Sequence, residues 1–559
     1  MKKLSLHQRI IAYTSIFFAF MFSFFLMFHT FSYDADKHHI QIASKLWSDF
    51  GAHIPLIRSF SYGPNTEWLL HGKPIESPLF PGEPIRYHFG FYAIVGLLEK
   101  IGVRIDWALN TISALGFFLL LIGIFRLSQT LFSSIAVAAL SVLFFLFNGS
   151  LSFISFFEKH PANFLTPLDI ITNSQFPSFG PWDNGLVTAF WNLNIYTNQR
   201  HLALSYGILL IIVYLLYHPP KKLWITGAYI GILTSILFFI NFAAAGIAAL
   251  FLGWAFLIKK DIRAPIVRAS LIIAPAALLL QTLSHTSSPI MWQPGYLSPH
   301  TTLSSLILFW VYNLGLHSIL IPLGVMAAPK HIRRLLAPPL LFLFVLPNLF
   351  QFSTDMINNH KFFNFFLTLG NIFSAYAVIK LIKLWNTIPT KWLSKLLQGL
   401  SAIILVVMLT ISGIIDFFPI INDTKGNIPD IPKNPDAQFF LTFTKPTDVI
   451  ANSTWFYHPA SIAGRSLFSG YTYFTWSYGY KQVEREDKLS HIYEADTARG
   501  ICNAATQNGV TFVELNPNPE PYLMPNLRIW QSLPPVYENQ ETHLKIYSVD
   551  DICSYNAHE

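Results

Sequence analysis

Two carboxylates lie close together near the start of the chain. Asp34 and Asp36 occur within the segment Tyr33-Asp34-Ala35-Asp36-Lys37-His38-His39. Such a pair can take a proton from a hydroxyl group as a general base, or it can hold a divalent cation such as Mg²⁺ or Mn²⁺. The spacing alone fits equally well a solvated loop whose acids pair with neighbouring basic residues.

The two side chains of this pair cannot share one face of a helix, because a 3.6-residue period separates them by about 200°. We therefore expect one carboxylate to face a reaction and the other to orient a neighbour, a metal ion or the loop. Lys37 beside Asp36 favours Asp36 as the orienting or metal-binding group, with Asp34 as the base. The reverse assignment stays open.

Basic side chains that could meet a phosphate group stand before other apolar segments. Arg86 and His88 precede an amphipathic segment that ends at Lys100. Arg200 and Lys361 stand directly before long apolar runs. A cation at the start of an apolar segment can bind a phosphate headgroup. It can equally anchor the segment by snorkelling to the membrane interface. For Arg86 and His88 the alternative is an ordinary interfacial helix.

Composition shows what kind of scaffold must position these residues. Of the 559 residues, 52% are hydrophobic and only 12% are charged, about half the charge of a soluble domain. Apolar runs of about 20 residues, the length of a membrane span, recur along the chain. We expect eleven spans, at 10–31, 107–127, 133–149, 202–218, 223–240, 243–258, 265–284, 303–327, 335–352, 362–383 and 397–418.

The charges of the short connections predict the orientation of these spans. One set of connections is rich in Lys and Arg, including Arg333 and Arg334 and the run from Lys380 to Lys395, whereas the loops at 285–302 and 353–360 have none. The positive-inside rule then makes the N-terminus cytoplasmic and everything after Asp416 extracytoplasmic. The net charge of +7 is explained by these loops and does not indicate a nucleic-acid partner.

The expected domains follow from this topology. Residues 1–419 form a transmembrane domain with extracytoplasmic loops 32–106 and 150–201, and residues 420–559 form a small extracytoplasmic α/β domain. In the latter, 448–453, 511–515 and 543–549 have strand character. The two cysteines of the chain, Cys502 and Cys553, both lie there, and an oxidising compartment favours a disulfide between them over two free thiols.

The whole architecture resembles the GT-C class of integral membrane glycosyltransferases, of the bacterial type that uses polyprenyl-phosphate sugars. Its most specific local element is Asp34-Ala35-Asp36 directly after the first span, and the segment from Tyr87 to Gly102 resembles the helix that follows in bacterial members. The resemblance implies an acidic first-loop residue as base or metal ligand, and a lipid-linked donor reached from the outer face. It also implies a glycan, lipid or protein acceptor and the inner membrane of a bacterium.

The resemblance assigns roles to the remaining polar residues. Asp34 and Asp36 become the catalytic or metal-binding carboxylates, and Arg86, His88, Arg200 and Lys361 become contacts to the donor phosphate. The main alternative is a polytopic transporter or flippase of lipid-linked or envelope components. The spans hold few charges, whereas transporters of charged substrates usually carry them there, so the enzyme is the preferred hypothesis.

Overall fold

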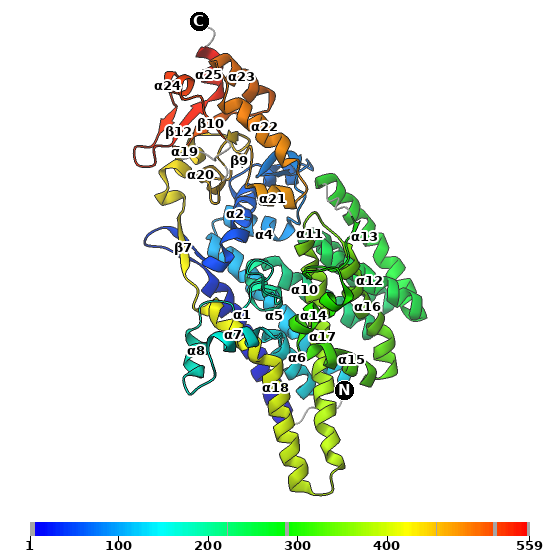
Figure 1. Cartoon of the computed structure of the whole chain (residues 1–559). Coiled ribbons are helices and arrows are strands. Elements are labelled where there is room, and N and C mark those ends of the chain that lie inside the picture. The colour runs from blue at the N-terminus through cyan, green and yellow to red at the C-terminus, as the bar shows by residue number, and fades with distance from the viewer. Residues whose placement is uncertain (1–5, 221, 285–289, 454, 518–522, 556–559) are drawn as a thin grey trace. The chain divides into compact units, whose positions relative to one another are not determined.

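The computed structural model describes residues 6–220, 222–284, 290–453, 455–517 and 523–555. These form two compact units (Figure 1). Unit 1 comprises residues 1–30, 110–277 and 289–424, and unit 2 comprises residues 31–109, 278–288 and 425–559. Each unit is described here by itself.

Unit 1 is a bundle of apolar helices. Eight helices in the described part of the chain are long and apolar enough to cross a membrane. The apolar helices α14 (Leu303–Leu314) and α15 (His317–Ala327) meet at 83°, as in a broken span or a re-entrant loop. The bend falls at Gly315, whose φ of 52° suits glycine and where a Cβ would collide with the backbone of Gly149.

Each of the eleven predicted spans coincides with a helix or with this bent pair. The long helices are α1 (Leu6–Thr30), α5 (Ile105–Phe132), α10 (Arg200–Tyr217), α11 (Leu223–Ile240), α13 (Arg263–Leu283), α16 (Lys330–Leu349), α17 (His360–Leu384) and α18 (Lys391–Ile421). Two further helices, α6 (Ile135–Leu146) and α12 (Phe242–Ile258), are apolar but shorter. The predicted polytopic helical fold is therefore confirmed.

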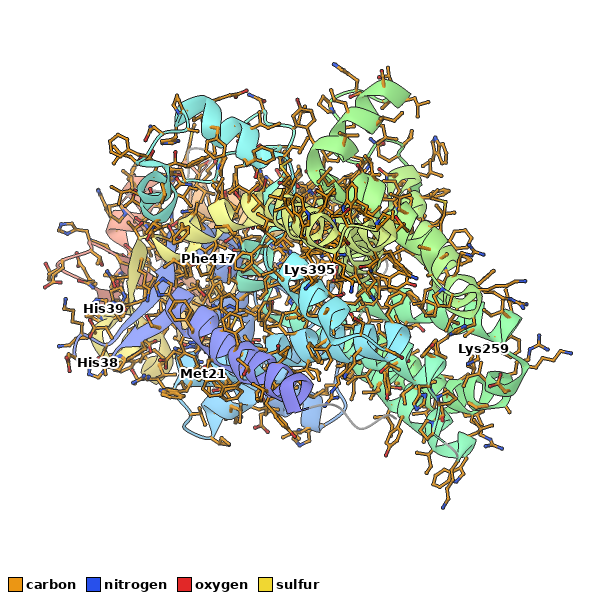
Figure 2. The ribbon with its side chains drawn as sticks, turned by 90° about the horizontal axis from the view of Figure 1, so that it is seen from below. Met21, His38, His39, Lys259, Lys395 and Phe417 are labelled. Atoms are coloured by element: carbon orange, nitrogen blue, oxygen red, sulfur yellow. A yellow bond between two sulfur atoms is a disulfide. The ribbon has the colours of Figure 1, made fainter. Side chains whose placement is uncertain are left out.

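Loop 150–201 carries short helices rather than extended chain. These are α7 (Ser152–Lys159), α8 (Thr166–Thr172), η2 (Ala189–Trp191) and α9 (Asn194–Asn198). Elsewhere in unit 1, Lys259 follows α12 and Lys395 lies near the start of α18 (Figure 2), both in segments predicted to be cytoplasmic. The first turns of α1 and the α17–α18 connection lie toward the same end of unit 1 (Figure 1), as that topology requires.

Unit 2 begins with a hairpin that follows α1 directly. Strand β1 (Phe31–Asp34) pairs antiparallel with β2 (His39–Ala43), and β2 pairs with β7 (Lys425–Pro429), the strand that follows α18. Ile40 is thereby opposite Tyr33 on one side and Ile428 on the other. Within unit 1, the His29 ring lies 2.8 Å from the Ile421 carbonyl oxygen, so α1 and α18 end side by side. The orientation of the spans in the membrane stays a prediction.

Two helices of the first outer loop pack beside this sheet. α2 (Trp47–Ser61) is buried along nearly its whole length and packs on α4 (Gly90–Lys100). Between them lie α3 (Asn65–Leu70) and the hairpin of β3 (Glu76–Ser77) and β4 (Phe80–Pro84). Gly96 lets the two packed helices approach closely, since a Cβ there would strike the backbone of Ile57.

The C-terminal part of unit 2 contains a five-stranded mixed sheet in the order β11-β12-β10-β8-β9. The predicted strands are present as β8 (Val449–Ala451), β10 (Phe512–Leu515) and β12 (Lys545–Ser548), and they are neighbours. β9 (Ser466–Leu467) and β11 (Tyr537–Glu538) complete the edges. Alternate residues point to opposite faces, so Val513 and Tyr547 enter one core while Ile450 and Ile546 enter the other.

Helices α23 (Ala498–Gln507) and α25 (Val549–Tyr555) cover one face of this sheet and carry the two cysteines. The structure contains the disulfide Cys502–Cys553, with the two Cα atoms 5.1 Å apart. The domain boundary after residue 419 stays a prediction. Compactness groups the first outer loop with the C-terminal part, but it does not define where an independently folding domain ends.

Candidate functional site

The two predicted catalytic carboxylates lie in one turn of the β1–β2 hairpin, whose end is marked by His38 and His39 (Figure 2). Asp34 is half-buried and Asp36 is exposed. Asp34 Oδ1 accepts hydrogen bonds from the backbone N–H groups of Asp36, at 3.1 Å, and Lys37, at 3.0 Å. Asp34 therefore shapes the turn that presents Asp36, which fits unequal roles for the two acids.

A metal bound at this turn would need ligands beyond the pair. Among the described residues, no three or more His, Cys, Asp or Glu side chains are grouped so that they could hold an ion. Asp34 and Asp36 could supply carboxylate oxygens, while water or donor phosphate would have to supply the rest. The metal stays a prediction.

Aromatic and ionic contacts support the β1–β2 hairpin. Arg104 stacks over the Tyr33 ring at 5.0 Å and binds Asp106 at 2.6 Å. Burial, with the charge and hydrogen bond of Asp430, raises the pKa of the Tyr33 hydroxyl to about 12. Tyr33 is therefore a neutral hydrogen-bonding group near neutral pH, directly beside Asp34.

A buried ion cluster ties α2, α4 and the segment after β7 together. Arg58 is 1% exposed and lies 3.2 Å from Glu99 and 3.0 Å from Asp430. Ser61 donates to the other oxygen of Glu99 at 2.7 Å. Burial raises the pKa of Glu99, whereas Arg58 and Ser61 lower it. Because no member of this cluster is accessible, we assign it to holding the outer elements in place.

Arg86 and His88 lie near the same unit's C-terminal segment. Arg86 donates to Glu83 at 3.1 Å and to the backbone carbonyl of Gly479, and it stacks over Tyr480 at 4.8 Å. Its side chain keeps 28% exposure. His88 is buried, with its ring 3.6 Å from that of Tyr87.

The other two predicted cations lie together in unit 1, where α10 and α17 begin side by side. Gln199 Nε2 and His360 Nε2, at these two helix starts, are 3.2 Å apart. The Tyr206 hydroxyl donates to the backbone carbonyl of Lys361. Lys361 is 6% exposed and donates to Asn358 at 3.0 Å. Helix N-termini in general favour anions, and a phosphate contact at this end of the bundle stays a prediction.

Arg200, at the start of α10, is fully buried and already bound by protein. Its guanidinium donates to Thr197 O at 2.7 Å, Thr30 Oγ1 at 2.9 Å and Asn110 Oδ1 at 3.2 Å. It therefore fastens α10 to the end of α1. A phosphate contact would require Arg200 to give up some of these bonds, and that role stays a prediction.

The structure thus groups the predicted site residues in two sets. Arg200 and Lys361 share unit 1, whereas Asp34, Asp36, Arg86 and His88 share unit 2. Whether the two sets act on one substrate stays a prediction.

One polar group that the sequence reasoning missed lies on α2. Asp49 and His53 are one helical turn apart, and His53 lines a cavity of about 20 Å³ with Tyr87, Tyr478 and Tyr480. That volume holds about one water molecule. The Asp-x-x-x-His spacing was the available signal, because residues four apart share a helix face.

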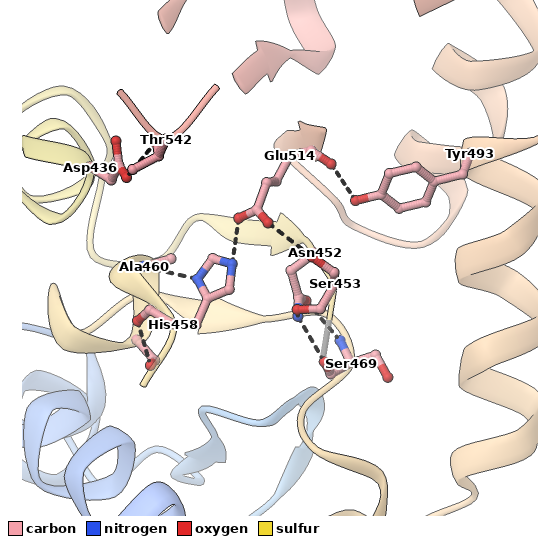
Figure 3. A network of polar contacts seen from close by, with 10 residues as sticks. Asp436, Asn452, Ser453, His458, Ala460, Ser469, Tyr493, Glu514 and Thr542 are labelled. Carbon is pink, nitrogen blue, oxygen red and sulfur yellow. Dashed lines mark hydrogen bonds and ion pairs between the residues drawn. The ribbon is translucent and has the colours of Figure 1, made fainter. Parts of the chain in front are cut away.

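A second missed network lies at the carboxyl ends of β8 and β10 (Figure 3). His458 and Glu514 form a fully buried pair, and Ser453 donates to Glu514 at 3.2 Å. His458 Nδ1 accepts from Ala460 N–H at 3.1 Å, which places the ring proton on Nε2, facing the Glu514 carboxylate. The network is closed to solvent and fixes the loop 455–458 that leads from β8.

Comparisons with known proteins give likenesses of structure only. No family model and no curated protein sequence matches the chain. Among solved structures, it is similar to ArnT from Cupriavidus metallidurans (TM-score 0.48, 10% identity, covering 97% of this chain and 99% of that one). It is also similar to the oligosaccharyltransferase of Archaeoglobus fulgidus in complex with an acceptor peptide (0.46, 11%, 90% and 69%).

Both of these proteins are GT-C membrane glycosyltransferases, the class that the sequence resembles. Another structure of the Archaeoglobus protein, with an inhibitory peptide and a dolichol-phosphate, matches at a TM-score of 0.41 and 13% identity, covering 92% of this chain and 70% of that one. Every one of these TM-scores is below 0.5, so these likenesses assign no function to the chain.

Proposed function

We propose that this chain is a membrane glycosyltransferase that moves a sugar from a lipid-phosphate-linked donor to an acceptor hydroxyl on the extracytoplasmic side. The observation that carries the proposal is the cationic end of unit 1. There Arg200 stands at the start of α10, and Lys361 stands at the adjacent start of α17. Arg200 also donates a hydrogen bond to Thr30 at the end of α1.

Chain connectivity keeps the acidic turn near this end. Asp34 follows Thr30 by four residues, and four extended residues span at most about 14 Å. A lipid-linked donor places its phosphate and its reactive sugar carbon within a similar distance of the interface. The proposal requires this acidic turn and the cations of unit 1 to act on the same donor.

The reaction that these groups support is an inverting displacement. Asp34, or Asp36 in the reverse assignment, takes the proton of the acceptor hydroxyl as its oxygen attacks the anomeric carbon of the donor sugar. The bond from that carbon to the phosphate oxygen breaks, and the lipid phosphate leaves with the bonding electrons. Lys361, the helix starts and, if it shifts partners, Arg200 stabilise the charge that develops on the phosphate.

The remaining assignments follow from the same geometry. Arg86 keeps an exposed face that could contact the donor phosphate, with His88 beside it. Asp34 and Asp36 would hold a divalent cation, which would supply positive charge for the leaving phosphate. We place the protein in the inner membrane of a bacterium, with unit 2 extracytoplasmic.

The test is sugar transfer by separate Asp34→Asn and Asp36→Asn variants in membranes that contain a polyprenyl-phosphate sugar. Asn keeps the shape of Asp but loses its basicity, so the variant that lacks the base should be slower by about 100- to 10,000-fold. Asp551→Asn, at an exposed carboxylate of α25, serves as the matched control. If both loop variants insert normally and turn over at the normal rate, this mechanism is wrong and the flippase hypothesis becomes the better one.

A further inference from the structure

A small polar cavity lies inside the helix bundle of unit 1, apart from the residues assigned above. Its volume is about 10 Å³, close to the smallest space that admits one water molecule. Its polar walls are Asn148, which follows α6, and Asn364 and Asn371, which lie on α17. Aromatic rings, among them Phe190 and Tyr196, also line it.

Two of these asparagines have amide atoms that the protein does not satisfy. Asn148 is 5% exposed and Asn371 is 1% exposed. Within the described ranges of the chain, Asn148 Oδ1, Asn148 Nδ2 and Asn371 Oδ1 are buried and have no hydrogen-bond partner. Buried side-chain amides are normally hydrogen-bonded, because an unpaired polar group in an apolar interior is costly. These three atoms therefore point to a partner from outside the chain.

The walls of the cavity are packed too tightly for a small shift of the chain to close it. The segment after α6 packs directly on α18, since a Cβ on Gly413 would lie 2.6 Å from the backbone nitrogen of Asn148. α6 packs along α17, and the Phe190 ring stacks on that of His360 at 5.1 Å. Close-packed interiors of this kind relax only partly around a cavity.

We propose that this cavity binds one water molecule, which joins Asn148 to Asn371. Both side chains line a space of one water's size, so a single molecule can reach both. A buried water typically makes about three hydrogen bonds. Here it would donate to Asn148 Oδ1 and Asn371 Oδ1 and accept from Asn148 Nδ2. Exchanging the amide oxygen and nitrogen of Asn148 leaves the same two acceptors and one donor.

A metal cation fits these atoms less well than water. Hard cations are held by oxygen atoms, and a cation here would also face the N–H groups of Asn148. The described residues that line the cavity include no carboxylate, so a cation would be buried without a counter-charge. A dry cavity fits least, because empty cavities in proteins have apolar walls.

The water site lies close to the cationic end of unit 1. Asn364, on the wall of the cavity, is one helical turn from His360, and Asn364 Nδ2 lies 3.2 Å from His360 Nδ1. Lys361 follows His360 directly. The water therefore helps to hold the part of α17 that, in the proposed function, contacts the donor phosphate. Only this link rests on the proposed function, and the water site itself does not.

A structure of the full-length protein in nanodiscs tests the site directly, at a resolution that shows ordered water elsewhere in the bundle. We expect one density peak within about 2.7–3.2 Å of the amide atoms of Asn148 and Asn371, the range of ordinary hydrogen bonds. The peak should be missing from the Asn148→Leu variant. An empty cavity beside ordered buried water elsewhere would overturn the proposal, and so would density too large for a water molecule.

Thermal unfolding in detergent gives a second measurement, which does not depend on sugar transfer. Asn148→Leu and Asn371→Leu each leave the water with fewer partners, and each should lower the apparent Tm by about 2–4 °C. The double variant removes all three amide atoms together, so its Tm should be higher than the sum of the two single changes predicts. Additive changes would overturn the proposal. A rise in Tm with each variant, the result expected for a dry cavity, would do the same.

Thr234→Val is the matched control. The Thr234 hydroxyl, on α11, is buried without a hydrogen-bond partner among the described residues, but Thr234 does not line the cavity. Its removal should leave the Tm unchanged or raise it. Replacing Na⁺ by choline at constant ionic strength should leave the Tm of the unmodified protein unchanged. A Na⁺-dependent Tm that Asn148→Leu abolishes would mean a bound cation and would overturn the proposal.

Discussion

At the scale of single residues, Lys361 and Arg200 differ in how the protein holds them. Lys361 donates to Asn358 and lies at a helix start. The Arg200 guanidinium donates hydrogen bonds to three parts of the chain: the segment before α10, the end of α1 and Asn110. Both looked alike in the sequence, because each is a basic residue that precedes an apolar run.

The two residues should therefore respond differently to substitution. Lys361→Met should leave the folded yield normal and raise the KM for the lipid-linked donor by about 10- to 150-fold, the equivalent of one charge-assisted contact of 1.5–3 kcal/mol. Arg200→Ala should instead lower the apparent Tm and the folded yield, because buried carbonyl and amide oxygens lose their donor. The measurements are donor titration and thermal unfolding in detergent. A stable Arg200→Ala protein with weakened donor use would restore the phosphate role.

At the scale of elements, the spans were predictable and the contacts between distant segments were not. Hydropathy over 20 residues locates a span without knowledge of its neighbours. Short segments rich in Val, Ile, Phe and Tyr predicted β8, β10 and β12. No local pattern indicates that Arg58 meets Asp430, 372 residues later, or that β7 extends the β1–β2 hairpin. For the same reason the cavity beside His53 was not predicted, because Tyr478 and Tyr480 line it from a distant part of the chain.

The Arg58 cluster gives the element-scale prediction. Arg58→Ala leaves Glu99 and Asp430 buried without their cation and should destabilise the protein by about 3–5 kcal/mol. Lys100→Ala breaks the exposed pair with Glu67, whose members are 37% and 59% exposed, and should cost less than about 1 kcal/mol. Thermal unfolding of both variants against the unmodified protein measures the difference. Equal effects would mean that the cluster does not hold α2 and α4.

The loss of Arg58 should also depend on pH. Burial already raises the pKa of Glu99, and removing Arg58 takes away the group that lowers it most. A folded-state pKa above the unfolded value means that the folded protein binds more protons, so its stability falls as pH rises through that range. The Arg58→Ala defect should therefore be smaller at pH 5 than at pH 8. A defect that grows toward low pH would contradict this assignment.

At the scale of the whole molecule, the disulfide and the predicted topology both favour an oxidising, extracytoplasmic compartment for unit 2. Cys502 and Cys553 close a loop with a sequence separation of 51, for which a cross-link contributes about 2–4 kcal/mol. We expect no free thiol in unreduced, denatured protein, and a lower apparent Tm for Cys502→Ser with Cys553→Ser. Labelling of both cysteines before reduction would argue against an oxidising compartment.

The orientation of the spans is the prediction on which the direction of the reaction depends. The structure places β1 and β7 in one sheet, so the ends of α1 and α18 open on the same side, and the Lys- and Arg-rich connections predict that the opposite side is cytoplasmic. Green fluorescent protein becomes fluorescent in the cytoplasm but stays dark when it is exported in an unfolded state. It should therefore fluoresce when fused after Arg334, at the start of α16. Fused after Asn427, in β7, it should be dark, whereas alkaline phosphatase at the two sites should give the reverse pattern.

Fluorescence at both positions would refute the topology. Unit 2, with its acidic turn, would then face the cytoplasm, where nucleotide sugars rather than lipid-linked ones are the abundant donors.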